Sequence, residues 1–268
     1  MKRTLLRGTE ALYSDGAYYD HIYRRRRDDV RFYVEMARRH GGPVLELGAG
    51  TGRVTLALAR AGFDAIGVDS HPAMLERARA EADKLPTSAR ARVRFRKGDL
   101  RSVRVEGRYP LVIAPFNVFM HLYERRDVER ALVTCRRHLA RRGRLVFDVM
   151  VPDLRALTQS PARLYKGRPV THPRDGKRYG YMESSHYDAL SQIRSIHMFL
   201  DQLEDPSVQE MIPLAHRQFF PAELDALLHY NGFTVERRYG DFALGPPAGD
   251  AESQVIVARP RRMASGRF

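Results

Sequence analysis

The sequence predicts an α/β protein whose parallel sheet is covered by helices on both faces. Short apolar runs alternate with helical stretches between residues 44 and 149, and again after residue 220. Such alternation is typical of parallel strands joined by helical crossovers. It is interrupted after Pro152, where a stretch rich in Pro, Gly and Arg leads into three β-like runs. We therefore expect an antiparallel β meander inserted into the sheet domain.

Apolar periodicity and turn residues give each element its expected bounds. The expected sheet strands are 44–47, 63–68, 93–96, 111–114, 145–149, 233–239 and 254–258, and the expected meander strands are 179–187, 192–200 and 209–219. The expected helices are 10–40, 54–61, 72–84, 124–140 and 221–230. Gly41-Gly42-Pro43 ends the first helix, and Asn231-Gly232 is a good C-cap pair for the last one.

Composition excludes several classes of protein. Of the 268 residues 43% are hydrophobic, which is enough for one sizeable core. The single cysteine, Cys135, excludes a disulfide framework and a cysteine-rich zinc site. No apolar run approaches the roughly 18–20 residues of a membrane span, and the N-terminus shows no secretory signal. A reducing cytoplasm is the expected compartment.

The charge balance leaves two interpretations open. Lys and Arg number 46 against 32 Asp and Glu, which gives a net charge of +14. Five of the basic residues are lysines, so 41 are arginines. A basic chain can indicate a phosphate-bearing partner, whereas a drift from Lys to Arg over the whole surface indicates none. The arginines are scattered, which favours the second interpretation, but the run Arg24–Arg27 keeps the first one open.

The sharpest motif follows the first sheet strand. Residues 44–53 read VLELGAGTGR, a buried strand that enters a glycine-rich turn and then a helix. Glycines allow a tight turn and let a ligand approach the main chain. The pattern is GxGxG, and Arg53 occupies the place of the third glycine of a dinucleotide fingerprint. Glu46, two residues before the first glycine, suits a cationic ligand better than a pyrophosphate.

Two more acids follow the next two strands. Asp69 ends the second strand, 21 residues after Gly48, and Asp99 follows the third. The carboxyl ends of parallel strands share one crevice, where such acids accept from ribose hydroxyls or from an exocyclic amine. Each Asp alone is more often a turn residue or a helix cap. Three acids at three consecutive strand ends point to a nucleoside-bearing ligand.

These segments together resemble the class I S-adenosylmethionine-dependent methyltransferases. The resemblance covers residues 43–150 and, as the closing helix and strand pair, residues 216–258. It implies a Rossmann-like, seven-stranded, mostly parallel sheet whose last strand, 254–258, is antiparallel. It also implies S-adenosyl-L-methionine as the cofactor. The residues it assigns to the cofactor are Tyr19, Tyr23, Glu46, Gly48, Ala49, Gly50, Gly52, Asp69, Ser70, Met74, Asp99, Leu100 and Phe116.

The resemblance also implies a role for most of these residues. Glu46 and the glycines would hold the methionine part, and Asp69 would accept from the ribose diol. Asp99 and Leu100 would bracket the adenine, with Met74 as an apolar contact or as plain core. We expect a bulky residue at Gly48 to clash with the ligand.

The segment after the fourth strand bears on what is methylated. Residues 114–117 read APFN, whereas nucleic-acid amino methyltransferases have an Asn/Asp-Pro-Pro-aromatic motif there. Enzymes that methylate cytosine C5 need a nucleophilic cysteine, and Cys135 lies in an apolar helical stretch. The segment is similar to small-molecule N-methyltransferases that act on amino sugars and glycine-like amines. Their Tyr-Asp-x-x-Tyr segment matches Tyr19 to Tyr23.

The expected acceptor site is built from the residues that follow the fourth strand. We expect three segments to enclose this site: the turn from Asn117 to His121, the helix that carries Tyr19 and Tyr23, and the meander. The expected substrate residues are Asn117, Tyr181 and Arg217. Methyl transfer needs alignment, and it needs a base only where the acceptor carries a proton. His121 is the candidate catalytic base, and a purely structural histidine is an equal alternative. No metal site is expected, because no His or acid pair has ligand spacing.

The expected organisation is a helical cap at 1–40, a methyltransferase domain at 41–152 and 216–260, a substrate cover at 153–215 and a mobile tail at 261–268. The favoured function is transfer of a methyl group to N or O of a small molecule by a monomer or homodimer. An RNA- or ribosome-directed methyltransferase is the alternative. A cofactor-binding module without turnover and a dehydrogenase remain more distant.

Overall fold

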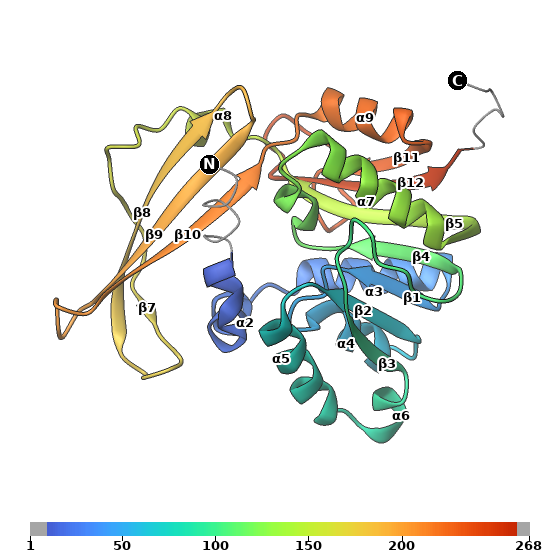
Figure 1. The fold of residues 1–268 in the computed structure, drawn as a ribbon, viewed down its shortest axis with the longest axis horizontal. Coiled ribbons are helices and arrows are strands. Elements are labelled where there is room, and N and C mark those ends of the chain that lie inside the picture. The colour runs from blue at the N-terminus through green and yellow to red at the C-terminus, as the bar shows by residue number, and fades with distance from the viewer. Residues whose placement is uncertain (1–9, 262–268) are drawn as a thin grey trace. The chain divides into compact units, whose positions relative to one another are not determined.

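The computed structural model describes residues 10–261, which form two compact units (Figure 1). The larger unit contains residues 26–151 and those from 219 onward, and the smaller contains residues up to 25 and 152–218. This division differs from the expected helical cap at 1–40, because residues 26–40 belong to the larger unit. Residues 1–9, and 262–268 of the expected tail, lie outside the described residues.

The larger unit is built on a seven-stranded sheet with the order β11-β12-β5-β4-β1-β2-β3. Adjacent strands from β3 to β5 are parallel, whereas β12 is antiparallel to both β5 and β11. This arrangement confirms the expected sheet and its antiparallel last strand. Its strands are β1 (Val44–Leu47), β2 (Ala65–Asp69), β3 (Val93–Lys97), β4 (Tyr109–Ala114), β5 (Leu139–Met150), β11 (Phe233–Tyr239) and β12 (Ser253–Pro260).

Helices cover both faces of this sheet. On one face, α3 and α4 bury Phe32, Met36 and Leu58 against the central strands, and α5 packs on α4. On the other face, α7 and α9 bury Leu132 and Leu224. The helical elements are α3 (Asp28–His40), α4 (Arg53–Arg60), α5 (Pro72–Asp83), α6 (Thr87–Arg90), the 3-10 helix η1 (Val118–His121), α7 (Arg125–His138) and α9 (Pro221–Tyr230).

The expected helix over residues 10–40 is broken. α2 (Gly16–Tyr23) starts after Asp15, whose Oδ1 accepts from the amide of Tyr18 at 2.8 Å, and α3 starts only at Asp28. Between them Arg26 leaves helical geometry, and its guanidinium lies 4.6 Å from the centroid of the Phe116 ring. A tertiary contact therefore overrides the local helical pattern, as it commonly does where propensity alone is weak.

The smaller unit is a five-stranded sheet that contains the expected meander. β8 (Arg178–Asp188), β9 (Ile193–Gln202) and β10 (Gln209–Arg217) are antiparallel in sequence order. Two short strands that the sequence pattern does not show, β6 (Tyr165–Lys166) and β7 (Val170–Thr171), also pair with β8. The short helix α8 (Leu154–Leu157) precedes them. Within this unit Leu12 and Tyr18 pack with apolar residues of the sheet.

The topology of the larger sheet brings the expected cofactor residues to one edge. β1 lies between β2 and β4, and the register pairs Glu46 with both Gly67 and Ile113. All three strands run in the same direction, so their carboxyl ends are neighbours. The glycine loop, Asp69 and Phe116 each follow one of these strand ends.

Candidate functional site

The glycine-rich loop between β1 and α4 is tied to the end of β2. Gly48, Gly50 and Gly52 have φ angles of 77°, 54° and 82°, which is left-handed backbone that favours glycine. The amides of Gly48 and Ala49 both donate to the carbonyl oxygen of Val68, at 2.8 and 2.9 Å. These main-chain hydrogen bonds fix the loop against β2.

The glycines of this loop differ in what surrounds them. A Cβ atom at Gly48 would lie 2.5 Å from Cγ2 of Val118, whereas a Cβ at Gly50 would have no described heavy atom within 4 Å. The expected clash of a bulky residue at Gly48 with a ligand therefore needs correction, because that residue would first meet Val118. Gly50 is the position whose open side can admit a ligand against the main chain.

Asp69 binds the loop from the end of β2. Its Oδ2 accepts from the amide of Gly50 at 2.7 Å, and its Oδ1 accepts from the amide of His71 at 2.8 Å. Burial raises the pKa of Asp69, and the two amides counteract this rise. Each carboxylate oxygen can accept two hydrogen bonds, so the group can also accept from the two hydroxyls of a ribose. This donor and acceptor set fits a nucleoside ligand.

Glu46 is buried beneath the loop. Its side chain is 2% exposed, and its Oε2 accepts from the hydroxyl of Thr55 on α4. Burial raises the pKa of Glu46 to about 8, although Thr55 and the charge of Arg53 lower it. Burial therefore favours the protonated form of Glu46. A cation placed beside it would favour the ionised form.

The residues expected near the adenine differ in their burial and in their hydrogen-bond partners. Asp99 is bound by the guanidinium of Arg101, with its shortest contact at 2.6 Å. Burial raises the pKa of Asp99, but Arg101 lowers it more in total. Met74 is 1% exposed within α5, Leu100 is half-buried and Ser70 is exposed. Their roles toward the cofactor stay predictions.

The chain leaves β4 through two left-handed residues. Phe116 and Asn117 have φ angles of 62° and 63°, and the 3-10 helix η1 that ends at His121 follows directly. The carboxylate of Asp148 accepts from the amides of Phe116 and Asn117, at 2.7 and 3.2 Å. The hydroxyl of Tyr33 donates to the same carboxylate at 2.5 Å. His121 is half-buried, and its catalytic role stays a prediction.

An arginine cluster packs over the outer side of Phe116. The guanidinium carbons of Arg26 and Arg53 lie 4.6 and 5.5 Å from the centroid of its ring. Asp29, which is fully buried, accepts from both terminal nitrogens of Arg53 at 2.7 and 2.6 Å, and from Nε of Arg26 at 3.2 Å. Within the run Arg24–Arg27, Arg26 is half-buried and has these partners, whereas the other three arginines are exposed.

The remaining predicted residues belong to the smaller unit. Tyr19 and Tyr23 lie on α2 with their ring centroids 4.8 Å apart. Tyr181 on β8 donates to Glu183 at 2.8 Å, and Arg217 at the end of β10 is 7% exposed. Their assignments to cofactor and substrate stay predictions.

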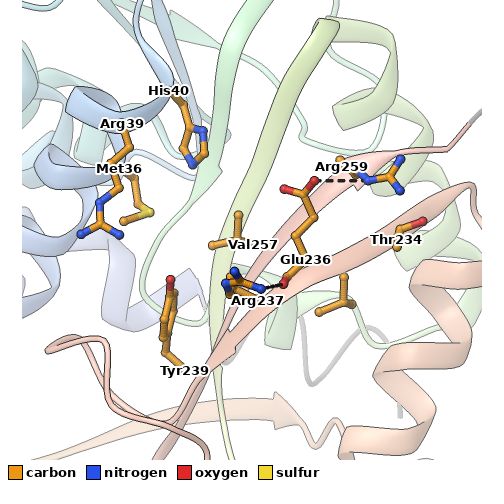
Figure 2. A pocket seen from close by; sticks show the side chains of 10 residues that line it. Met36, Arg39, His40, Thr234, Glu236, Arg237, Tyr239, Val257 and Arg259 are labelled. Atoms are coloured by element: carbon orange, nitrogen blue, oxygen red, sulfur yellow. Dashed lines mark hydrogen bonds and ion pairs between the residues drawn. The ribbon is translucent and has the colours of Figure 1, made fainter.

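Other hollows lie away from the strand ends. One cavity of about 560 Å³ is lined by residues of α3, β11 and β12 (Figure 2). Met36, Arg39 and His40 face Glu236 and Arg237 across it, and none of the predicted site residues lines it. Within residues 10–261, no group of three or more His, Cys, Asp or Glu side chains is placed to hold a metal ion. In the same range, no helix is long and apolar enough to cross a bilayer.

Sequence reasoning missed the carboxylates that organise the turn after β4. Asp148 and Asp29 are buried, and neither belongs to a recognisable motif. The signal that could have found Asp148 is its place in the strand LVFDVM, since a lone acid in a buried strand needs a partner. The expectation that Cys135 is core is confirmed, because the thiol is buried and burial raises its pKa to about 12.

Comparison with known proteins gives a family match within the larger unit. Residues 44–143 match the family described as "Methyltransferase domain". This part of the chain is therefore similar to methyltransferase domains, as the sequence resemblance implied. The sequence resemblance implies S-adenosylmethionine as the cofactor, and one solved structure of similar fold, that of the glycopeptide N-methyltransferase MtfA, is complexed with it; that structure has a TM-score of 0.60 at 21% identity and covers 86% of each chain. The matched range contains the glycine loop, Asp69, Asp99 and the turn after β4.

The individual relatives extend this match. A glycine/sarcosine N-methyltransferase of Parasynechococcus marenigrum (strain WH8102) is 30% identical over 148 residues, which are 52% of this chain and 51% of that protein. The alignment thus spans about half the length of that relative. The enzyme of the same name from Aphanothece halophytica is 27% identical over 85% of this chain and 80% of its own. The CcbJ methyltransferase from Streptomyces caelestis superposes with a TM-score of 0.79 at 24% identity, covering 94% of this chain and 99% of its own.

Proposed function

We propose that the chain transfers a methyl group from S-adenosylmethionine to a small-molecule acceptor, with an amine nitrogen as the favoured atom. The observation that carries this proposal is the turn after β4, which lacks the Asn/Asp-Pro-Pro-aromatic motif of nucleic-acid amino methyltransferases and instead reads APFN. The glycine/sarcosine N-methyltransferases among the relatives support nitrogen as the acceptor atom. Oxygen methylation is the other outcome that the experiment below distinguishes.

The residues at the strand ends would each bind a different part of the cofactor. The main chain at Gly50 and the carboxylate of Asp69 would hold the nucleoside, with Glu46 beneath the loop near the methionine part. The bound cofactor supplies an electrophilic sulfonium methyl group and a neutral leaving group. The protein then has to align the acceptor and exclude water, because in-line displacement depends on the angle of approach. The turn at Phe116 and Asn117 is the part of the chain that we assign to alignment.

A base is needed only when the acceptor amine arrives protonated, and we propose His121 for that role. Imidazole has the pKa range that suits proton removal near neutral pH. His121→Ala should then lower kcat by about 100-fold, while the affinity for the cofactor stays the same. A small loss that does not change with pH would assign His121 to structure.

The experiment that tests the function is a screen of small amines and alcohols for release of S-adenosylhomocysteine. We expect turnover with a small amine and none with RNA. Mass spectrometry of the product identifies the methylated atom. If no small molecule is methylated and purified ribosomal RNA is, the proposal is wrong.

An RNA- or ribosome-directed methyltransferase is the second candidate, because the net charge is +14 and three arginines of the run 24–27 are exposed. Phosphate contacts release counterions, so such binding weakens steeply as salt rises. Affinity for RNA that survives physiological salt would favour this candidate. A reducing cytoplasm and a monomer or homodimer remain our proposals for compartment and assembly.

A further inference from the structure

Two adjacent residues after β4 hold a left-handed backbone conformation that is unfavourable for Phe. Phe116 and Asn117 both have φ near +60°, and only Asn is among the non-glycine residues that tolerate this region. A bulky Phe in this region is an outlier that persists only where the surroundings enforce it. Something outside the turn must therefore hold it.

Asp148 supplies that restraint. It lies on β5 directly after Phe147, which is the register partner of Ala114, so its side chain reaches the residues that leave β4. The carboxylate is 1% exposed and accepts the amide of Phe116 at 2.7 Å and the amide of Asn117 at 3.2 Å. Each of its oxygens therefore holds one of the two left-handed residues.

Tyr33 in turn fixes the carboxylate from α3. Its fully buried hydroxyl donates to Oδ1 of Asp148 at 2.5 Å, the same oxygen that accepts from Phe116. Burial raises the pKa of Asp148, while the charge of Arg26 lowers this pKa and that of Asp29 raises it further. The ring of Phe116 packs against Arg26 on its other side. The turn is thus restrained through its main chain and through its aromatic side chain.

We propose that Asp148 is a positioning residue for methyl transfer, because its carboxylate fixes the turn that aligns the acceptor. This inference rests on the proposed function, since it assumes that the turn adjoins the transferred methyl group. Displacement of a reacting group by about 1 Å can lower a rate about 100-fold even when binding is kept. Loss of Asp148 should therefore affect kcat more than it affects the affinity for the cofactor.

The central variant is Asp148→Asn, which keeps the size of the side chain. Its amide oxygen can accept a hydrogen bond from one of the two backbone N–H groups. Its NH₂ group then faces the other N–H group, and because both groups are donors no hydrogen bond forms there. We expect kcat to fall about 10- to 100-fold, with the Kd for S-adenosylhomocysteine changed less than about threefold. Tyr33→Phe, which leaves both backbone bonds intact, should lower kcat only about two- to fivefold.

His138→Leu is the matched control. His138 is buried like Asp148, and its Nε2 accepts the amide of Val105 at 2.9 Å. It precedes β5 at the opposite end of the strand from Asp148. We expect this variant to lose stability while its kcat stays within about twofold of the wild type.

A second readout does not require an acceptor. The chain contains no tryptophan, so Phe116→Trp places a single tryptophan in the turn, whose emission can be excited apart from that of the tyrosines. In this background Asp148→Asn should shift the emission to longer wavelength and increase quenching by acrylamide, because the restraint on the turn is lost. His138→Leu in the same background should leave both unchanged. This readout also serves for any Asp148 variant too unstable for kinetics.

Three results would overturn the inference. The first is a kcat of Asp148→Asn within about twofold of the wild type. The second is an equal loss of kcat in Asp148→Asn and His138→Leu, which would mean general destabilisation. The third is unchanged fluorescence of the tryptophan at position 116. If the wild type methylates no acceptor, the proposed function fails, and the fluorescence still decides whether Asp148 holds the turn.

Discussion

The loop after β1 and the turn after β4 both contain left-handed residues, but different interactions stabilise this conformation in each. Both follow neighbouring parallel strands. The loop uses glycines, for which this conformation carries no steric cost. The turn uses Phe116 and Asn117 and depends on Asp148, which lies 31 residues further along the chain. The conformation of the loop can therefore be predicted from its own residues, whereas that of the turn depends on a contact that forms only in the folded protein.

The largest expected effect breaks the loop itself. Gly48→Val adds a Cβ atom 2.5 Å from Val118 and places a β-branched residue at φ 77°. We expect a loss of about 3 kcal/mol or more in the free energy of unfolding, measured by urea denaturation. The double variant with Val118→Ala should recover the part due to the clash but not the part due to φ. Equal stability of Gly48→Val and the wild type would show that the loop is not as tightly packed as described.

The turn provides the matched comparison at Asn117. Asn117→Gly and Asn117→Val both remove the side-chain amide, but only Val opposes φ of 63°. We expect the Val variant to be less stable than the Gly variant by about 1–2 kcal/mol in urea denaturation. Both variants keep the amide N–H that Asp148 accepts, so the difference isolates the backbone conformation. Equal stabilities would contradict a left-handed residue at this position.

A pH-dependent prediction concerns Glu46 beneath the loop. Burial raises its pKa to about 8 in the folded state, above the unfolded value of about 4.3. Between these values the unfolded chain loses the proton while the folded chain keeps it, so this group lowers stability as pH rises. Glu46→Gln cannot titrate. The melting temperature of the wild type should therefore fall relative to Glu46→Gln from about pH 5 to about pH 8. A constant difference would mean that Glu46 is ionised throughout this range.

The fold was largely predictable because its signals are local. Pro72 at the start of α5 and the Asn231-Gly232 pair after α9 place their helix ends where the structure has them. The break before Asp28 was not predictable, because it depends on Arg26 reaching the ring of Phe116. β6 and β7 were missed since each has only two residues, too few to show alternation.

The candidate site also contains residues that the sequence predicted and residues that it did not. Gly50 and Asp69 were predictable from motif spacing and are joined in the structure by a 2.7 Å hydrogen bond. The roles of Asp148 and Tyr33 were not, because 115 residues separate them and only packing brings them together. Motif spacing thus predicts the proposed cofactor residues, whereas the residues that restrain the turn after β4 are brought together only by buried tertiary contacts.

The central claim is that Gly50 and Asp69 form the cofactor site, and titration calorimetry with S-adenosylhomocysteine tests it most directly. Asp69→Ala should retain the fold by circular dichroism and bind about 10- to 150-fold more weakly, the scale of a hydrogen bond to a charged group, about 1.5–3 kcal/mol. Asp83→Ala is the control, because Asp83 is an exposed residue at the end of α5 and should leave the affinity unchanged. An Asp69→Ala variant that binds as tightly as the wild type would contradict the account and move the nucleoside away from the end of β2.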